Sequence, residues 1–186
     1  MNKKCICAAV AVMLSASAAA AQTPVMENAE MFRAAPEQNV VDRPLQLPNP
    51  IKEHTSIAAV EKAVGFMPLA LRHNGHYTLT ACETIEKTAQ LVYRESDVKN
   101  NNRLMIRTAL RRETDARSLS GYYADWMPVV VSRTAVSVTT GNGINYAAYW
   151  RNGMYSYSVS MTETTAPAFM EILVPLVAQT EAGRTF

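Results

Sequence analysis

Residues 144–161 read INYAAYWRNGMYSYSVSM, with Asn152-Gly153 between two alternating runs. Asn-Gly in this setting is the strongest short-range signal for a β-hairpin. Successive side chains of a strand point to opposite faces of a sheet, so every second residue should share a face. The residues that share one face are Tyr146, Ala148 and Trp150 on the first arm and Tyr155, Tyr157, Val159 and Met161 on the second. We therefore expect a hairpin over residues 146–161, with Trp150 in the core.

Other strand-like runs precede this hairpin, at residues 77–85, 88–95, 103–110, 128–131 and 134–140. On the N-terminal side of these runs, Thr55 or Ser56 is placed to cap a helix that ends at Gly65. After the hairpin, Thr164 or Thr165 is placed to cap a second helix. Its apolar residues recur at helical spacing: Phe169, Ile172, Leu173, Leu176 and Val177. This order predicts an α+β fold, an antiparallel sheet of five to seven strands with an N-terminal and a C-terminal helix packed on one face.

The N-terminus has the pattern of an export signal. Lys3 and Lys4 precede an apolar run, and Ala19-Ala20-Ala21 offers a cleavage site before Gln22. The run is shorter than the roughly 20 residues that cross a bilayer, so we expect no stable membrane span after cleavage. We assign residues 1–21 to a signal peptide, 22–50 to a Pro-rich tail or spacer, and 51–182 to a single α+β domain. The protein is then periplasmic or secreted.

Charge and cysteine content narrow the possible functions. The chain has 18 Lys and Arg against 16 Asp and Glu, and the loss of Lys3 and Lys4 makes the exported chain neutral. Such a balance argues against nucleic acid as a partner. Of the three Cys, only Cys82 lies outside the signal, so no internal disulfide is expected. Cys82 lies in a strand-like run, which favours a buried, inert thiol over a reactive one.

No pattern of catalytic or metal-binding residues is recognisable. His73 and His76 lie in a predicted turn, but two histidines without a neighbouring Cys or carboxylate cluster do not form a known zinc pattern. There is no Gly-x-Ser-x-Gly nucleophile elbow. We therefore expect no enzyme, no catalytic residues, no metal and no cofactor. A small exported hydrolase or transferase with an unrecognised site remains the alternative.

Two groups of residues are candidates for contact with a ligand or partner. Tyr122, Tyr123 and Trp126 lie in a loop-like segment, where aromatic rings either close the sheet edge or form a recognition surface. Arg103 and Arg107 should share a strand face, which is either a solvated face with ion pairs or a weak site for an anionic group.

Three segments carry a resemblance to a known family. They are AVGFMP at residues 63–68, AQLVY at 89–93 followed by LMIR at 104–107, and AYWRNGMYSYSV at 148–159 before the capped helix. In this arrangement the chain resembles a bacterial extracytoplasmic domain family of unknown function. That family is found in anti-sigma-factor-like and sporulation-associated membrane proteins. The resemblance implies a non-catalytic sensory or scaffold module, with no catalytic residues to transfer.

These observations together lead to one expectation about function. We expect an exported, non-catalytic binding or sensory module that contacts a protein or a cell-envelope component. The oligomeric state and the identity of the partner stay open.

Overall fold

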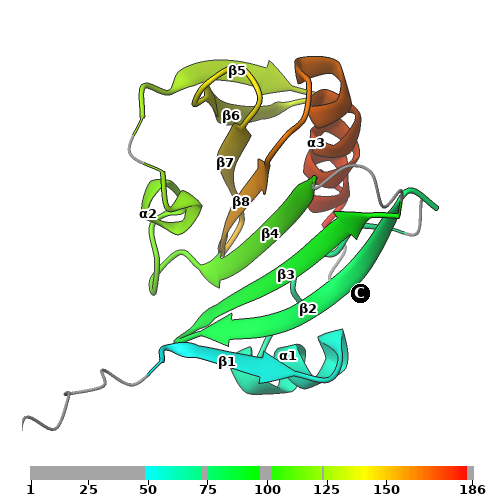
Figure 1. The fold of residues 1–186 in the computed structure, drawn as a ribbon. Coiled ribbons are helices and arrows are strands. Elements are labelled where there is room, and N and C mark those ends of the chain that lie inside the picture. The colour runs from blue at the N-terminus through cyan, green and yellow to red at the C-terminus, as the bar shows by residue number, and fades with distance from the viewer. Residues whose placement is uncertain (1–48, 73–74, 97–101, 123, 184–186) are drawn as a thin grey trace, which may run out of the picture. The chain divides into compact units, whose positions relative to one another are not determined.

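The computed structural model describes residues 49–72, 75–96, 102–122 and 124–183. These residues form one antiparallel sheet of eight strands, in the order β1-β2-β3-β4-β8-β7-β6-β5, with three helices (Figure 1). The strands are β1 Ile51–His54, β2 Tyr77–Ile85, β3 Thr88–Glu95, β4 Arg103–Leu110, β5 Met127–Val131, β6 Thr134–Thr140, β7 Tyr146–Asn152 and β8 Tyr155–Met161. The helices are α1 Ile57–Val64, α2 Ala116–Ser120 and α3 Ala166–Glu181. The predicted α+β class with an antiparallel sheet is confirmed.

The expected number of five to seven strands was too low. Strand β1 was not predicted, because its four residues show no alternation of apolar and polar side chains. This strand forms because the edge of β2 offers backbone partners, with Ile51 opposite Ile85 and His54 opposite Cys82. The short helix α2, which begins after Asp115 and ends at Gly121, was not predicted either. The predicted signal peptide and nearly all of the spacer lie outside the described residues.

The hairpin of β7 and β8 is present, but its turn is one residue later than predicted. Asn152 pairs with Tyr155, so the two turn residues are Gly153 and Met154. Gly153 has a φ of 54°, whereas Met154 is not among the residues with positive φ. Positive φ at the first turn position alone is the requirement of a type II′ turn, for which glycine is favoured.

The two faces of the sheet differ in chemistry, and the pairing register shows it. Leu91, Ile106, Val159 and Ala148 lie opposite one another across β3, β4, β8 and β7. They belong to the main hydrophobic cluster together with Val60 of α1 and Phe169 and Leu173 of α3, so both of these helices cover this side. We call it the helix face.

The neighbouring row on the opposite side is polar. Gln90, Arg107, Ser158 and Tyr149 lie across the same four strands. The short helix α2 packs here, because the hydroxyl groups of Ser156 and Ser158 donate to the carbonyl oxygens of Thr114 (2.9 Å) and Leu119 (3.3 Å). We call this side the α2 face.

The ends of the two long helices follow the predicted capping pattern. The hydroxyl group of Ser56 accepts from the backbone N–H of Ala59, and Gly65 takes the left-handed conformation that ends α1. The hydroxyl group of Thr165 accepts from the N–H of Ala168 at the start of α3. Trp150 is 1% exposed, which confirms its place in the core.

Candidate functional site

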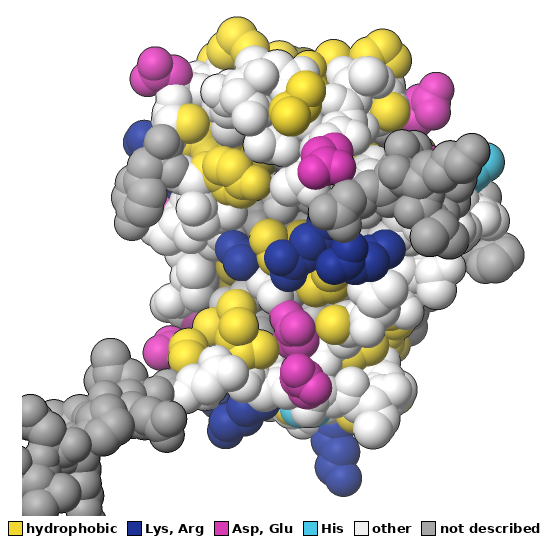
Figure 2. All heavy atoms as spheres, in the orientation of Figure 1, with side chains coloured by type: hydrophobic (Ala, Val, Ile, Leu, Met, Phe, Trp, Pro, Cys, Tyr) yellow, Lys and Arg dark blue, Asp and Glu magenta, His cyan; other side chains and the backbone are white. Residues whose placement is uncertain are grey.

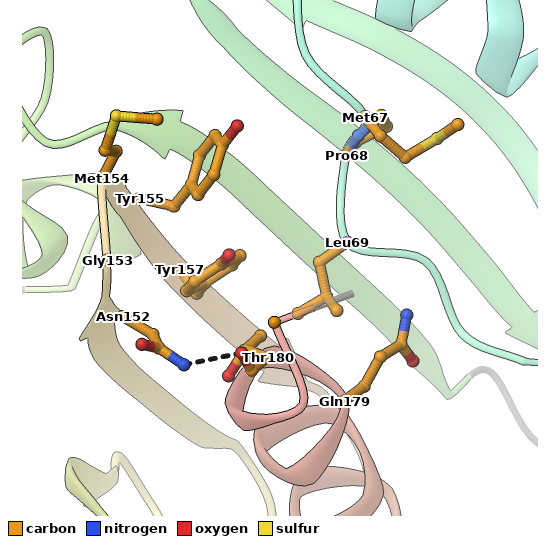
Figure 3. Close-up of a pocket in the computed structure, with 11 residues that line it drawn as sticks. Met67, Pro68, Leu69, Asn152, Gly153, Met154, Tyr155, Tyr157, Gln179 and Thr180 are labelled. Carbon is orange, nitrogen blue, oxygen red and sulfur yellow. Dashed lines mark hydrogen bonds between the residues drawn. The ribbon is translucent and has the colours of Figure 1, made fainter. Parts of the chain in front are cut away.

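A pocket of about 270 Å³ opens on the helix face where three segments of the chain meet (Figure 3). Residues 67–69, which follow α1, form one wall. The tip of the β7–β8 hairpin forms the second wall, and the last turn of α3 forms the third. The lining consists of Met67, Pro68, Leu69, Asn152, Gly153, Met154, Tyr155, Tyr157, Gln179, Thr180 and Gly183. We call this the tyrosine pocket, after Tyr155 and Tyr157.

Hydrogen bonds hold the three walls in place. The side-chain amide of Asn152 donates to the carbonyl oxygen of Thr180 at 2.6 Å, which ties the hairpin to α3 (Figure 3). The indole N–H of Trp150 donates to the Thr180 hydroxyl group at 3.1 Å. The backbone N–H of Leu69 donates to the hydroxyl group of Thr108 on β4 at 3.0 Å. Each wall is therefore fixed to the sheet or to its neighbour, so the pocket is formed before any ligand arrives.

The lining of the pocket is mostly apolar, and its polar groups are uncharged. None of the described lining residues is Asp, Glu, Lys, Arg or His. Tyr157 stacks on Trp150, with 5.4 Å between ring centroids, and burial raises the pKa of Tyr157 to about 12. At neutral pH the described lining is therefore uncharged, and it suits an uncharged apolar group with a few hydrogen-bonding atoms.

Of the predicted contact residues, Arg107 uses its side chain for hydrogen bonds within the protein. Its Nε donates to Gln90 Oε1 at 2.6 Å. Its Nη1 donates to the carbonyl oxygens of Leu119 (3.1 Å) and Ser120 (3.4 Å) at the end of α2. Burial lowers the pKa of Arg107, and the positive charge of Arg103 adds to this effect. The Arg107 side chain thus links the sheet to α2.

The other predicted residues lie around this link. Arg103 is exposed on the same strand face as Arg107, and Tyr122 lies close enough to Arg107 to oppose, in small part, the lowering of its pKa. Trp126 is half-buried and packs edge-on against Tyr149, with 4.6 Å between ring centroids. Tyr123 lies outside the described residues. The structure therefore brings Arg103, Arg107 and the Tyr122 end of the loop to the α2 face.

Lys and Arg side chains form a band across the middle of the molecule in the view of Figure 2, with acidic side chains below it. The pairing register accounts for part of a basic row on β3 and β4, because Arg94 lies directly opposite Arg103 and Arg107 follows on the same face. Whether this band contacts a partner stays a prediction.

The tyrosine pocket was missed by the sequence analysis. The alternation of Tyr155 and Tyr157 indicated one face of a strand. A strand face in the core and a strand face that lines a pocket have the same residue types, so the alternation could not distinguish them. The one signal that bore on it was Gly153, which marks the exposed hairpin tip where Met154 is 69% exposed.

Within the described part of the chain, no group of three or more His, Cys, Asp or Glu is placed to hold a metal ion. His73 lies outside that part, so the His73–His76 pair stays untested. Among the same described residues, no helix has the length and apolar character needed to cross a membrane. Comparisons with protein-family models, curated proteins and solved structures each found no match to this chain.

Proposed function

We propose that this protein is an exported, non-catalytic binding module that holds an uncharged apolar group of a protein or cell-envelope component in the tyrosine pocket. The observation that carries the proposal is the pocket itself, a preformed concavity of about 270 Å³ whose described lining has no charged side chain. Concave, mostly apolar sites with a few convergent polar groups are the usual form of a ligand site.

The residue types of the pocket suit recognition. Met67 and Met154 have flexible, polarizable side chains that adapt to ligands of different shape. Tyr155 and Tyr157 present large, stiff ring surfaces and hydroxyl groups that can bond a polar edge of the ligand. Gln179 adds a side-chain amide to the lining. An apolar side chain or acyl group could therefore contact the rings, while the polar group that carries it bonds to the amide.

Methionine methyl groups allow a direct test, because two of them line the pocket and others lie elsewhere. We would label the methionine methyl groups with ¹³C and titrate the protein with N-acetyl-phenylalanine amide and, separately, with octanamide, both of which are uncharged. The expected result is saturable shifts at Met67 and Met154. Met127 and Met170 are the internal controls, because they are exposed on β5 and α3, away from the described pocket lining. A response to N-acetyl-phenylalanine amide alone would indicate a peptide group, and a response to octanamide alone an acyl chain.

A matched variant makes the test specific for the pocket. Tyr155→Ala should remove one ring from the wall and weaken binding about tenfold or more, since a buried aromatic contact contributes roughly 1.5–3 kcal/mol. Tyr149→Ala removes a ring of the same kind from the other sheet face and should leave binding unchanged. Equal shifts at all four methionines, or equal loss in both variants, would contradict the proposal.

A further inference from the structure

A second hollow lies on the opposite side of the sheet from the tyrosine pocket and differs from it in charge. Its volume is about 630 Å³, and it is open to solvent. Arg117 of α2, Arg133 of the β5–β6 turn and Arg151 of β7 all line it. Three arginines from three separate elements therefore border one space, together with Asp115. We call it the arginine hollow.

Acidic side chains orient two of these arginines. Asp115 forms an ion pair with Arg151 and accepts from the backbone N–H of Arg117 at 3.0 Å. Glu181 lies 3.7 Å from the Nε of Arg133 and accepts from the backbone N–H of the same residue at 2.8 Å. Burial alone would raise the pKa of Asp115, but the hydrogen bonds from Arg151 and Arg117 hold it below its usual value. Hydrogen bonds from the Thr134 hydroxyl group and the Arg133 N–H likewise lower the pKa of Glu181. Both acids are therefore charged at neutral pH, and each lies beside one arginine.

The arginines outnumber the acids, which leaves the hollow positively charged. Three arginines face Asp115 and Glu181, so the balance of these five residues is one positive charge. Among the described residues, the guanidinium of Arg117 has no ion-pair partner. Guanidinium groups bind oxyanions through paired N–H donors, and a phosphate group presents enough oxygen atoms to meet several arginines at once.

An aromatic ring completes the wall. Tyr149 lines the hollow and is held edge-on by Trp126, at an interplanar angle of 72°. A ring fixed in this way offers a flat surface beside the arginines, which a sugar or other small ring could cover. The site thus has a charged part for an oxyanion and an apolar part for the group that carries it.

We propose that the arginine hollow binds a phosphate-type oxyanion, either as the free anion or as a phosphate group on a sugar that lies against Tyr149. This site is distinct from the tyrosine pocket, since no arginine lines that pocket and, of the described lining residues, only Asn152 borders both.

Calorimetric titration of the whole protein tests the proposal, with inorganic phosphate and glucose 6-phosphate as the two probes. The ionic strength is kept low, because salt screens exposed charges. Arg117→Gln should lower the affinity for both probes about tenfold, which is the effect of losing one charge-assisted hydrogen bond. The control is Arg112→Gln, which removes the same charge from an exposed arginine that pairs with Glu113 outside the hollow. It should leave both affinities unchanged.

A third variant separates the two sources of the oxyanion. If glucose 6-phosphate binds more tightly than inorganic phosphate, Tyr149→Leu should abolish this difference in affinity. The affinity for inorganic phosphate should stay unchanged. Equal affinity of the two probes for the unmodified protein would identify the free anion as the ligand. Arg133→Gln repeats the main test at a second position, should Arg117→Gln lower the melting temperature. Equal weakening by Arg112→Gln, or no saturable binding of either probe, would overturn the proposal.

Discussion

The side chain of Arg107 shows how one residue can look like a contact residue in the sequence and serve a different role in the structure. On its strand it is a basic residue with Arg103 on the same face, as an exposed anion site would require. In the fold, Gln90 and two carbonyl oxygens of α2 take up its guanidinium. The Gln90 amide in turn donates to Glu83, so the chain of contacts runs from β2 to α2.

This role predicts different effects of two arginine substitutions. Arg107→Ala should lower the free energy of unfolding by about 1–3 kcal/mol, because it leaves buried acceptors of Gln90 and α2 without a donor. Arg103→Ala removes an exposed arginine from the same strand and should change it by less than about 0.5 kcal/mol. Urea denaturation of both variants measures the difference. Equal losses, or a loss only in Arg103→Ala, would show that the Arg107 bonds contribute nothing to stability.

At the scale of elements, the β7–β8 hairpin depends on the conformation of a single glycine. Gly153→Ala should destabilise the protein by about 1 kcal/mol, since any residue with a Cβ atom is strained at positive φ. An added Cβ would meet no atom within 4 Å, so the expected loss comes from the backbone alone. Thermal or urea unfolding measures it.

Gly141 provides the matched control for this substitution. It also lies in a turn with no atom within 4 Å of an added Cβ, but its φ is not in the positive range. Gly141→Ala should therefore leave stability unchanged or slightly higher, because alanine restricts the unfolded chain. Similar losses at both positions would mean that the conformation of Gly153 is not the cause.

The elements with strong local signals were predictable, and those defined by their neighbours were not. The hairpin, the capped helices and the strands β2, β3 and β4 have alternation or caps within their own residues. Strand β1 forms only against the edge of β2. Helix α2 has caps of its own in Asp115 and Gly121, but it is only five residues long and is held by hydroxyl groups of β8. The turn was misplaced by one residue because Asn152 is also suited to a turn, while its amide bond to Thr180 depends on distant sequence.

The same distinction applies to the candidate sites. The walls of the tyrosine pocket come from segments that are far apart in the chain, such as residues 67–69 and the end of α3. No spacing within one segment encodes that meeting. The sequence identified Trp126 and the arginines of β4 as residues suited to recognition, but it could not tell which arginine the fold would use internally.

At the scale of the whole molecule, the sheet separates an uncharged pocket on the helix face from a charged hollow on the α2 face. The helix face holds two buried tyrosines, Tyr93 and Tyr157, at 4% and 9% exposure. Burial raises the pKa of each to about 12 from an ordinary value near 10, and in Tyr93 this outweighs the hydrogen bond that it accepts from the Leu71 N–H. Both rings are therefore neutral in the folded protein at pH values where they ionise in the unfolded chain.

These shifts predict a loss of stability in alkali. A group with a raised folded pKa contributes stability that is intact below the unfolded pKa and is lost as pH rises through the folded pKa. The window therefore runs from about pH 10 to about pH 12. A difference of about two pKa units corresponds to at most about 2–3 kcal/mol for each tyrosine. The free energy of unfolding, measured by urea titration at several pH values, should fall steeply across this window.

Tyr157→Phe tests whether Tyr157 causes its part of the expected loss of stability in alkali. The variant keeps the ring that stacks on Trp150 but has no group to ionise, so its stability at pH 7 should stay within about 1 kcal/mol of the original. Its alkaline loss should shrink by about half, because Tyr93 still titrates. Tyr93→Phe should instead cost stability at every pH, since the N–H of Leu71 loses its acceptor. Alkaline profiles that coincide for the original protein and Tyr157→Phe would show that the Tyr157 hydroxyl group reaches solvent, and the tyrosine pocket would then be more polar than its lining indicates.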